Sequence, residues 1–198
     1  IISSPNCSTI VMLMALAPLH HANPIKRVIV DTYQSASGAG GKGIMELMQQ
    51  ARDVLEERET AHSTFPHTLA FNVLPHVEEF SDDDYTTEEI KMQNETRKIM
   101  HLPDLPVSAT CVRVPVPISH SEAVHIEFTD PFTPGEACQV LTEAPGVIVQ
   151  DDVEHKVYPL ATDASDKDEV FVGRIRKDKA LENGLSIWVV GDNLRKGA

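Results

Sequence analysis

The chain has 198 residues, of which 41% are hydrophobic and 24% charged, a composition that suits one globular domain with a substantial apolar core. Its formal net charge of −13 argues against a nucleic-acid partner or an anionic membrane surface, because both carry negative charge themselves. Three widely spaced cysteines without a CxxC pair fit neither a disulfide framework nor a zinc site, and they favour a reducing compartment. The longest apolar run, residues 10–18, is too short to span a bilayer.

The first stretch with chemical content is a Pro-Asn-Cys-Ser sequence around Cys7, where a loop meets an apolar helix expected over about residues 8–17. A turn is expected over residues 18–24. Asn6 or Ser8 can cap the helix through a side-chain oxygen. A thiol at a helix start faces unpaired backbone N–H groups and the positive end of the helix dipole, which favours the thiolate. Cys7 is therefore a candidate nucleophile for acyl transfer, and a buried structural cysteine is the alternative.

A β-branched run at residues 25–32 predicts a strand, and a helix is expected over about residues 44–59. The apolar positions that predict one buried face of this helix are Ile44, Met48, Ala51 and Leu55. The loop at 33–43 contains a GxGxxG pattern, but a polar stretch separates the strand from the first glycine, which argues against a dinucleotide fold. What remains is a flexible loop able to approach an anionic or amide-bearing ligand, with Gln34 placed to hydrogen-bond it, or else a plain loop.

A polar helix is expected to begin at Thr86, which stands in capping-box spacing with Glu89, and to run to about residue 100. On this helix Glu88 and Lys91 are three residues apart and share a face. The ordinary interpretation is a surface ion pair. The functional interpretation is an anion and a cation that together hold a zwitterionic substrate.

Residues 110–117 and 123–128 predict two strands, with a break between them that contains His120. Arg113 lies within the first strand and suits bidentate binding of a carboxylate, whereas His120 suits proton transfer near neutral pH. Structural roles are the alternative for both side chains. No HExxH pattern is present, so no metal site is expected.

The remainder predicts a helix-containing segment at 131–145 and three further strands at 146–150, 170–176 and 185–190. The sum is an α+β domain in which strands outnumber helices. Strands this hydrophobic need cover on both faces, from helices or from a second subunit.

Seven stretches in order carry a resemblance to a known family: PNCSTI at 5–10, TYQSASGAG at 32–40, AFNVLPH at 70–76, TEEIKMQNETRKI at 87–99, CVRVPVPISHSEAV at 111–124, VGRIRKD at 172–178 and GDNLRKGA at 191–198. Together they resemble aspartate-semialdehyde dehydrogenase. Within that family residues 1–198 are similar to the C-terminal catalytic and dimerisation domain, a mixed sheet with helices on one face as in the C-terminal domain of glyceraldehyde-phosphate dehydrogenase. The resemblance implies that the N-terminal Rossmann domain, which binds NADP, and a last helix lie outside this sequence.

The resemblance also implies roles by matching position. Cys7 would attack L-4-aspartyl phosphate and form a thioester as phosphate leaves; a hydride from NADPH would then yield L-aspartate 4-semialdehyde, with His120 as the acid/base. The remaining expected site residues are Gln34, orienting the substrate; Arg113 and Glu88, binding its α-carboxylate and amino group; Asn6 and Lys91, holding the phosphate; and Ser37, Gly38 and Asn193, touching the nicotinamide end of NADP. The family's reaction serves lysine, threonine, methionine and isoleucine biosynthesis, in a homodimer of the cytoplasm or plastid stroma.

One departure is Ile118-Ser119, where the family often has a glycine before the histidine, so the local loop is expected to differ. N-Acetyl-γ-glutamyl-phosphate reductase performs the same chemistry on an acylated substrate, but its usual Gly-Cys-Tyr-Pro-like motif does not match Asn6-Cys7-Ser8-Thr9. A non-catalytic dimerisation fragment is a second alternative. Because a further phosphate-binding arginine is expected outside this sequence, the isolated chain is predicted to be inactive.

Overall fold

The structure is a computed structural model that describes residues 4–197. In chain order its elements are α1 (Cys7–Ala22), β1 (Ile25–Gln34), the 3₁₀ helix η1 (Ala36–Ala39), α2 (Gly40–Leu55), α3 (Thr87–Ile99), β2 (Val107–Arg113), β3 (His120–Phe128), α4 (Pro134–Glu143), β4 (Val147–Val149), α5 (Ala161–Ala164), β5 (Val170–Lys177) and β6 (Gly184–Gly191). Each expected strand is present, but β2 ends at Arg113 rather than at residue 117, and β3 begins at His120, which was expected in the break before it.

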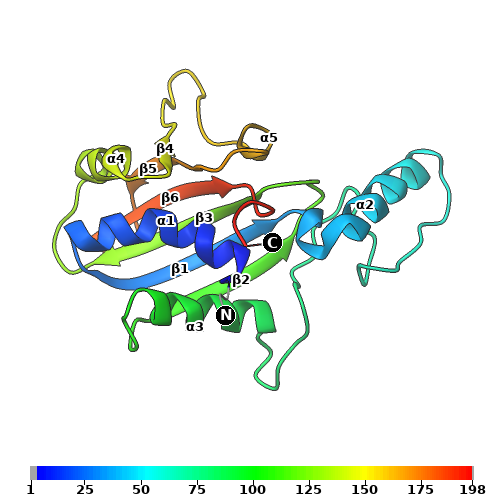
Figure 1. The fold of residues 1–198 in the computed structure, drawn as a ribbon, viewed down its shortest axis with the longest axis horizontal. Coiled ribbons are helices and arrows are strands. Elements are labelled where there is room, and N and C mark those ends of the chain that lie inside the picture. The colour runs from blue at the N-terminus through cyan, green and yellow to red at the C-terminus, as the bar shows by residue number, and fades with distance from the viewer. Residues whose placement is uncertain (1–3, 198) are drawn as a thin grey trace.

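The strands form one mixed sheet in the order β2-β1-β3-β6-β5-β4 (Figure 1). β1 runs parallel to β2 and antiparallel to β3, and β4 runs parallel to β5. The register sets Gln34 beside Arg113 and Thr32 opposite Glu122. The sequence-based α+β fold class with a mixed sheet is therefore confirmed, and its register brings polar side chains from three strands to one end of the sheet.

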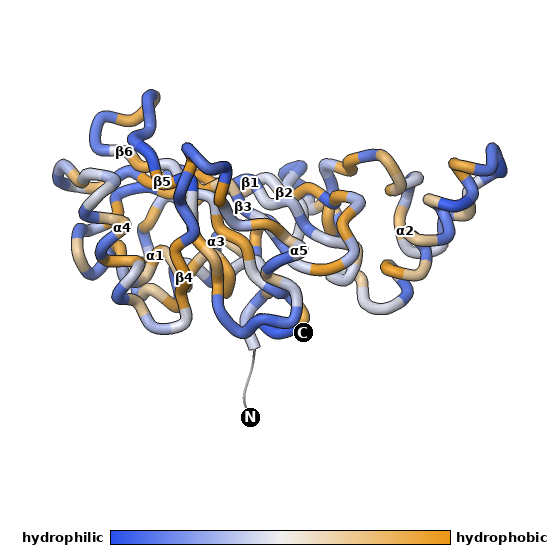
Figure 2. Tube along the Cα trace, turned by 90° about the horizontal axis from the view of Figure 1, so that it is seen from above, coloured by the Kyte–Doolittle hydropathy of each residue, from blue (hydrophilic) through white to orange (hydrophobic). Residues whose placement is uncertain are grey.

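Helices α1, α3 and α4 cover one face of the sheet, and Figure 2 shows them on the same side of the strands. The main core lies beneath them, and it includes the fully buried Met12, Leu16 and Ile126. No helix of comparable size covers the opposite face in residues 4–197, where Tyr33 remains 38% exposed and packs against Trp188 with ring centroids 5.4 Å apart. The sheet thus has one helix-covered face and one open face.

Helix α1 continues five residues past the end predicted from the sequence, so the turn expected over residues 18–24 was wrong in its first part. Pro18 lies inside the helix, where proline removes a backbone hydrogen bond. Leu19, one residue later, is fully buried in the core. His20 in the last turn accepts a hydrogen bond from the backbone of Ile25. Packing and this contact outweigh the interruption that Pro18 causes.

Helix α2 lies beyond the end of the sheet, and its predicted buried face was wrong (Figure 1). The buried positions include Leu47 and Gln50, whereas Met48 is 47% and Leu55 74% exposed. Gln50 accepts hydrogen bonds from the backbone N–H groups of Leu69 and Ala70. The helix therefore turns toward the following loop rather than toward the sheet, and tertiary contacts decided which face is covered.

Candidate active site

A cleft of about 340 Å³ opens where the start of α1 meets the ends of β1 and β2 and the first turns of α3. Seven of the ten residues predicted for the site line it: Asn6, Cys7, Gln34, Gly38, Glu88, Lys91 and Arg113. The other three, Ser37, His120 and Asn193, are buried next to it. The structure therefore gathers residues that are far apart in the sequence around one cavity.

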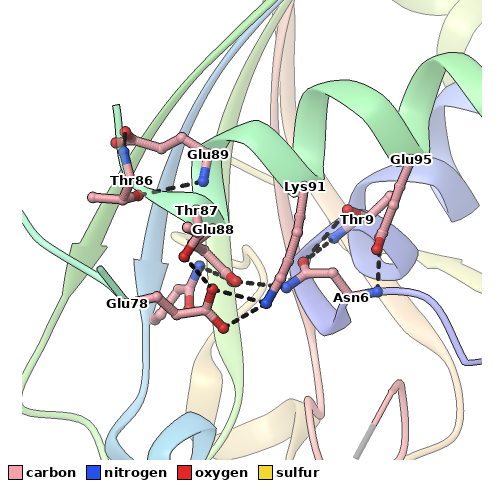
Figure 3. Close-up of polar contacts among 10 residues, drawn as sticks. Asn6, Thr9, Glu78, Thr86, Thr87, Glu88, Glu89, Lys91 and Glu95 are labelled. Carbon is pink, nitrogen blue, oxygen red and sulfur yellow. Dashed lines mark hydrogen bonds and ion pairs between the residues drawn. The ribbon is translucent and has the colours of Figure 1, made fainter. Parts of the chain in front are cut away.

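Asn6 fixes the start of α1, as the sequence predicted, and ties it to α3 (Figure 3). Its Oδ1 accepts from the Thr9 N–H at 3.0 Å, satisfying one of the unpaired donors of the first turn. Its Nδ2 donates to Glu88 at 2.8 Å, and its backbone N–H donates to Glu95 at 2.8 Å. Cys7, the first helical residue, is consequently held at a defined place on the cleft wall.

The thiol of Cys7 does not have the lowered pKa that its place at a helix start suggested. Burial, followed by the nearby Glu88 carboxylate, raises the pKa of Cys7 to about 11, although the backbone N–H of Ser8 opposes the rise. The expectation of a thiolate at neutral pH was therefore wrong. A cation brought into the cleft beside Glu88 would lower the pKa of this thiol.

Glu88 is a buried anion held by neutral donors. Its Oε1 accepts from Gln34 Nε2 at 2.9 Å and its Oε2 from Asn6 Nδ2 at 2.8 Å, while Gln34 Nε2 also donates to Thr32 at 3.2 Å. No ion pair compensates the charge of Glu88 among residues 4–197. The carboxylate is thus oriented toward the cleft and able to accept a positively charged group.

Lys91 does not pair with Glu88, although the two share a helix face as predicted. Its Nζ instead contacts both carboxylate oxygens of Glu78, at 2.6 and 2.8 Å (Figure 3). The charged end of Glu78 comes from the loop before α3. The charge of Lys91 on this wall of the cleft is therefore already neutralised by Glu78.

Arg113 and Gly38 meet at the base of the cleft. Arg113 is 7% exposed and donates through Nη1 to the Ser35 carbonyl at 2.8 Å. A Cβ on Gly38 would lie 2.6 Å from that Nη1 and 3.2 Å from the His120 ring. The segment expected to be a flexible loop is instead ordered by η1, and glycine is required here because both side chains approach the backbone closely.

His120 is fully buried at the start of β3. Its Nδ1 accepts from the Ser35 N–H at 3.1 Å, which places the proton of a neutral imidazole on Nε2. That Nε2 has no hydrogen-bond partner within residues 4–197. Burial, and then the charge of Arg113, lower the pKa of His120 to about 3. The ring is therefore a neutral hydrogen-bond donor through Nε2–H.

Asn193 organises the backbone behind the cleft. Its Oδ1 accepts from the hydroxyls of Ser35 and Ser37 at 3.1 and 2.9 Å, and from the Ser119 N–H at 3.0 Å. Ser119 has a φ of +76°, a left-handed conformation that costs a non-glycine residue about 1 kcal/mol. The serine that stands where the resembling family often has glycine thus keeps a glycine-like backbone, and Asn193 helps to hold it.

Three acidic residues near the cleft were not singled out from the sequence: Glu78, Glu95 and Glu122. Glu95 lies two helical turns after Glu88, and this spacing could have indicated that both face α1. Glu122 lies two residues after His120 on β3, so strand alternation places both on the same face. It is fully buried, and neither carboxyl oxygen has a partner within the described residues.

No three His, Cys, Asp or Glu side chains gather among residues 4–197 in a way that could hold a metal ion. No helix in that part of the chain combines the length and apolar character required to cross a membrane.

Comparison with known proteins shows close similarity over the whole sequence. Residues 16–196 match the family described as semialdehyde dehydrogenase, dimerisation domain. The chain is 53% identical to an aspartate-semialdehyde dehydrogenase of Aquifex aeolicus, covering 100% of this chain and 58% of the relative. It superposes with a TM-score of 0.96 on aspartate semialdehyde dehydrogenase II from Vibrio cholerae, at 44% identity. The match covers 100% of this chain and 58% of the Vibrio cholerae chain.

A second structure of the Vibrio cholerae protein, complexed with ASA, gives the same TM-score of 0.96 at 43% identity, again covering 100% of this chain and 58% of the other. The chain therefore spans about 58% of the length of the relatives that it resembles.

Proposed function

The chain belongs to the semialdehyde dehydrogenase dimerisation-domain family, and from this premise we propose that it is the catalytic and dimerisation half of an NADP-dependent aspartate-semialdehyde dehydrogenase. The proposed reaction is the reductive dephosphorylation of L-4-aspartyl phosphate to L-aspartate 4-semialdehyde, in the biosynthesis of lysine, threonine, methionine and isoleucine. The observation that carries the proposal is the cleft itself, which places a thiol beside one buried carboxylate, one guanidinium and one ammonium group.

The charges of the cleft match those of a zwitterionic substrate that bears a phosphate. Arg113 offers a planar cation for the α-carboxylate, and Glu88, so far bound only by neutral amides, offers an anion for the ammonium group. Lys91 lies on the same face of α3 and would hold the phosphate together with Asn6. An acetylated amino group would carry no charge and would leave Glu88 uncompensated, which favours the aspartyl substrate over the N-acetylglutamyl alternative.

In the proposed first step the sulfur of Cys7 attacks the acyl carbon, so that an S–C bond forms and the C–O bond to phosphate breaks, and the thiol proton leaves with the phosphate. The ammonium group of the bound substrate would lie near Glu88 and lower the pKa of Cys7 that this carboxylate raises. Gln34, fixed by Thr32 and Glu88, would orient the acyl group for the attack. Substrate binding and nucleophile activation are thereby coupled.

NADPH, when bound, supplies the hydride that reduces the thioester. His120 Nε2–H, without a partner in residues 4–197, would donate a hydrogen bond to the resulting oxyanion, which collapses to the aldehyde as the S–C bond breaks; the Cys7 thiolate then takes a proton from solvent. Of the residues expected near the nicotinamide, Gly38 lines the cleft, whereas Ser37 and Asn193 are buried and bonded to each other. We propose that these two hold the Gly38 backbone in place for the cofactor.

We further propose that the protein is a homodimer formed through the open face of the sheet. Tyr33 and Ile29 are exposed there at 38% and 36%, and Trp188 packs on Tyr33. The matched family is described as a dimerisation domain. Sedimentation velocity of the chain and of a Tyr33→Lys variant tests this: the variant should sediment as a monomer, and a variant that stays dimeric would move the interface elsewhere.

The reaction is tested with the chain joined to the amino-terminal part of the Aquifex aeolicus relative. We expect phosphate-dependent reduction of NADP with aspartate semialdehyde, none with N-acetylglutamate semialdehyde, and loss of activity in Cys7→Ala. Cys138→Ala serves as the matched control, because this thiol lies on α4, away from the cleft. The chain by itself should show no turnover.

Activity only with the acetylated substrate would overturn the assignment of the substrate and leave the thioester mechanism in place. Activity that survives in Cys7→Ala would overturn the assignment of the nucleophile. Absence of activity with both substrates in a folded fusion protein would favour a non-catalytic dimerisation fragment.

A further inference from the structure

We propose that Glu78 is an internal competitor for the phosphate subsite: its carboxylate is paired with Lys91, and an incoming phosphate must displace it. The inference rests on the proposed function, which makes Lys91 the cation that holds phosphate. It adds a residue that sets how tightly phosphate is bound.

The contacts of Glu78 are those of an anion seated on an anion-binding group. Its two oxygens lie 2.6 and 2.8 Å from Lys91 Nζ, and one of them accepts from the Thr87 hydroxyl at 2.7 Å (Figure 3). Lys91 and Thr87 both belong to α3, so one carboxylate bridges two donors of the same helix. Glu78 and Lys91 both line the cleft, so a phosphate oxygen bound to Lys91 would compete with this carboxylate.

The other two cleft carboxylates are engaged elsewhere. Glu88 is bound by the side-chain amides of Gln34 and Asn6, and Glu95 accepts from the Asn6 backbone N–H. Of these three acids, only Glu78 forms an ion pair with a cation of the cleft. Competition for Lys91 is therefore specific to Glu78.

Glu78 is also the member of the Glu78–Lys91 pair that can move. Lys91 is held on a helix, whereas Glu78 lies in a loop outside every helix and strand, with a side chain 39% exposed. Its φ of +65° is in the left-handed region that side chains rarely adopt. Glu78 lines both the catalytic cleft and a neighbouring cavity of about 580 Å³, which offers space for a displaced side chain.

Such a competitor suits a reaction in which phosphate is released. A carboxylate that returns to Lys91 after the acyl–phosphate bond breaks would weaken the hold on the product and let it leave. It would also neutralise Lys91 whenever no substrate is bound.

The test is a calorimetric titration of the chain with inorganic phosphate in low-chloride buffer, in the wild type and in Glu78→Gln, Glu79→Gln and Lys91→Ala. Glutamine keeps the shape and the Thr87 hydrogen bond but removes the competing charge, so Glu78→Gln should bind phosphate about three- to tenfold more tightly. Glu79→Gln removes the adjacent carboxylate, which does not line the cleft, and should change the affinity less than twofold. Lys91→Ala should abolish binding.

Weaker or unchanged binding in Glu78→Gln, with binding still dependent on Lys91, would overturn the inference alone, because Glu78 would then position Lys91 rather than compete for it. Equal tightening in Glu78→Gln and Glu79→Gln would also overturn it, as a general charge effect. No phosphate binding in any variant, Glu78→Gln included, would overturn the phosphate subsite and the inference with it.

Discussion

Replacement of Glu122 by glutamine tests whether this fully buried carboxyl group is protonated in the folded chain and what that does to stability. Burial, followed by the Glu88 carboxylate, raises the pKa of Glu122 well above its ordinary value of 4.5. The folded chain therefore keeps a proton that the unfolded chain releases above that pH. This residue's contribution to stability is fully present below pH 4.5 and is lost as the pH rises toward the folded pKa.

The size of the effect follows from this proton linkage. Each pH unit in the window lowers the free energy of unfolding of the wild type by about 1.4 kcal/mol. From pH 4.5 to pH 7 the interval is 2.5 units, which gives at most about 3 kcal/mol. Glutamine stays neutral at every pH, so Glu122→Gln should gain up to that amount at pH 7, or at most about 6–12 °C in Tm for a chain of this length. Near pH 4 the gain should vanish.

Thermal unfolding followed by circular dichroism from pH 4 to pH 8 measures the difference. Glu127→Gln is the matched control on the same strand, because the hydrogen bond from Lys26 lowers the pKa of Glu127. The stabilisation that ionised Glu127 provides is present above its ordinary pKa. Glu127→Gln should therefore become less stable than the wild type toward neutral pH, rather than more stable. Parallel pH profiles for the wild type and Glu122→Gln would refute the reasoning, since Glu122 would then be ionised in the folded chain.

Three further predictions concern the cleft. The imidazole of His120, with its pKa lowered to about 3, should show no NMR titration between about pH 5 and pH 8; a midpoint in that range would contradict its neutral state. Gly38→Ala in the fusion protein should lower kcat by up to about 100-fold, because the added Cβ would clash with Arg113 and crowd the His120 ring, while Gly41→Ala, with nothing within 4 Å of the added Cβ, should not. Alkylation of Cys7 by iodoacetamide should rise with pH up to about 11, and Glu88→Gln should move the midpoint to lower pH; an unmoved midpoint would remove that carboxylate as a cause.

The sequence by itself determined the features that neighbouring residues can satisfy. Asn6, one of the two residues expected to cap α1, does so, and Thr86 with Glu89 forms the capping box that their spacing predicted. These caps can be predicted from the sequence because the donors at a helix start are only two or three residues from the side chain that accepts from them. The strands were found for a similarly local reason, since β-branched runs such as residues 25–32 favour extended backbone.

The sequence pattern also supplied the candidates for the site, but their side-chain partners depended on the fold. Glu88 and Lys91 share a helix face as their spacing requires, yet Lys91 pairs with Glu78 from a preceding loop. Helix α2 has an apolar stripe, yet the stripe is partly exposed, because the following loop and not the sheet lies against the helix. Local spacing gives the face of a helix and not the segment that packs on it.

Only the tertiary structure decided the electrostatics of Cys7. The helix start alone favours a thiolate at Cys7, but burial under the rest of the chain and the carboxylate of Glu88 on another helix raise its pKa to about 11. The charge of Arg113 and complete burial likewise keep His120 neutral. Desolvation and Coulomb energies depend on distances in space between groups far apart in the chain, and those distances exist only once the sheet and its helices have packed.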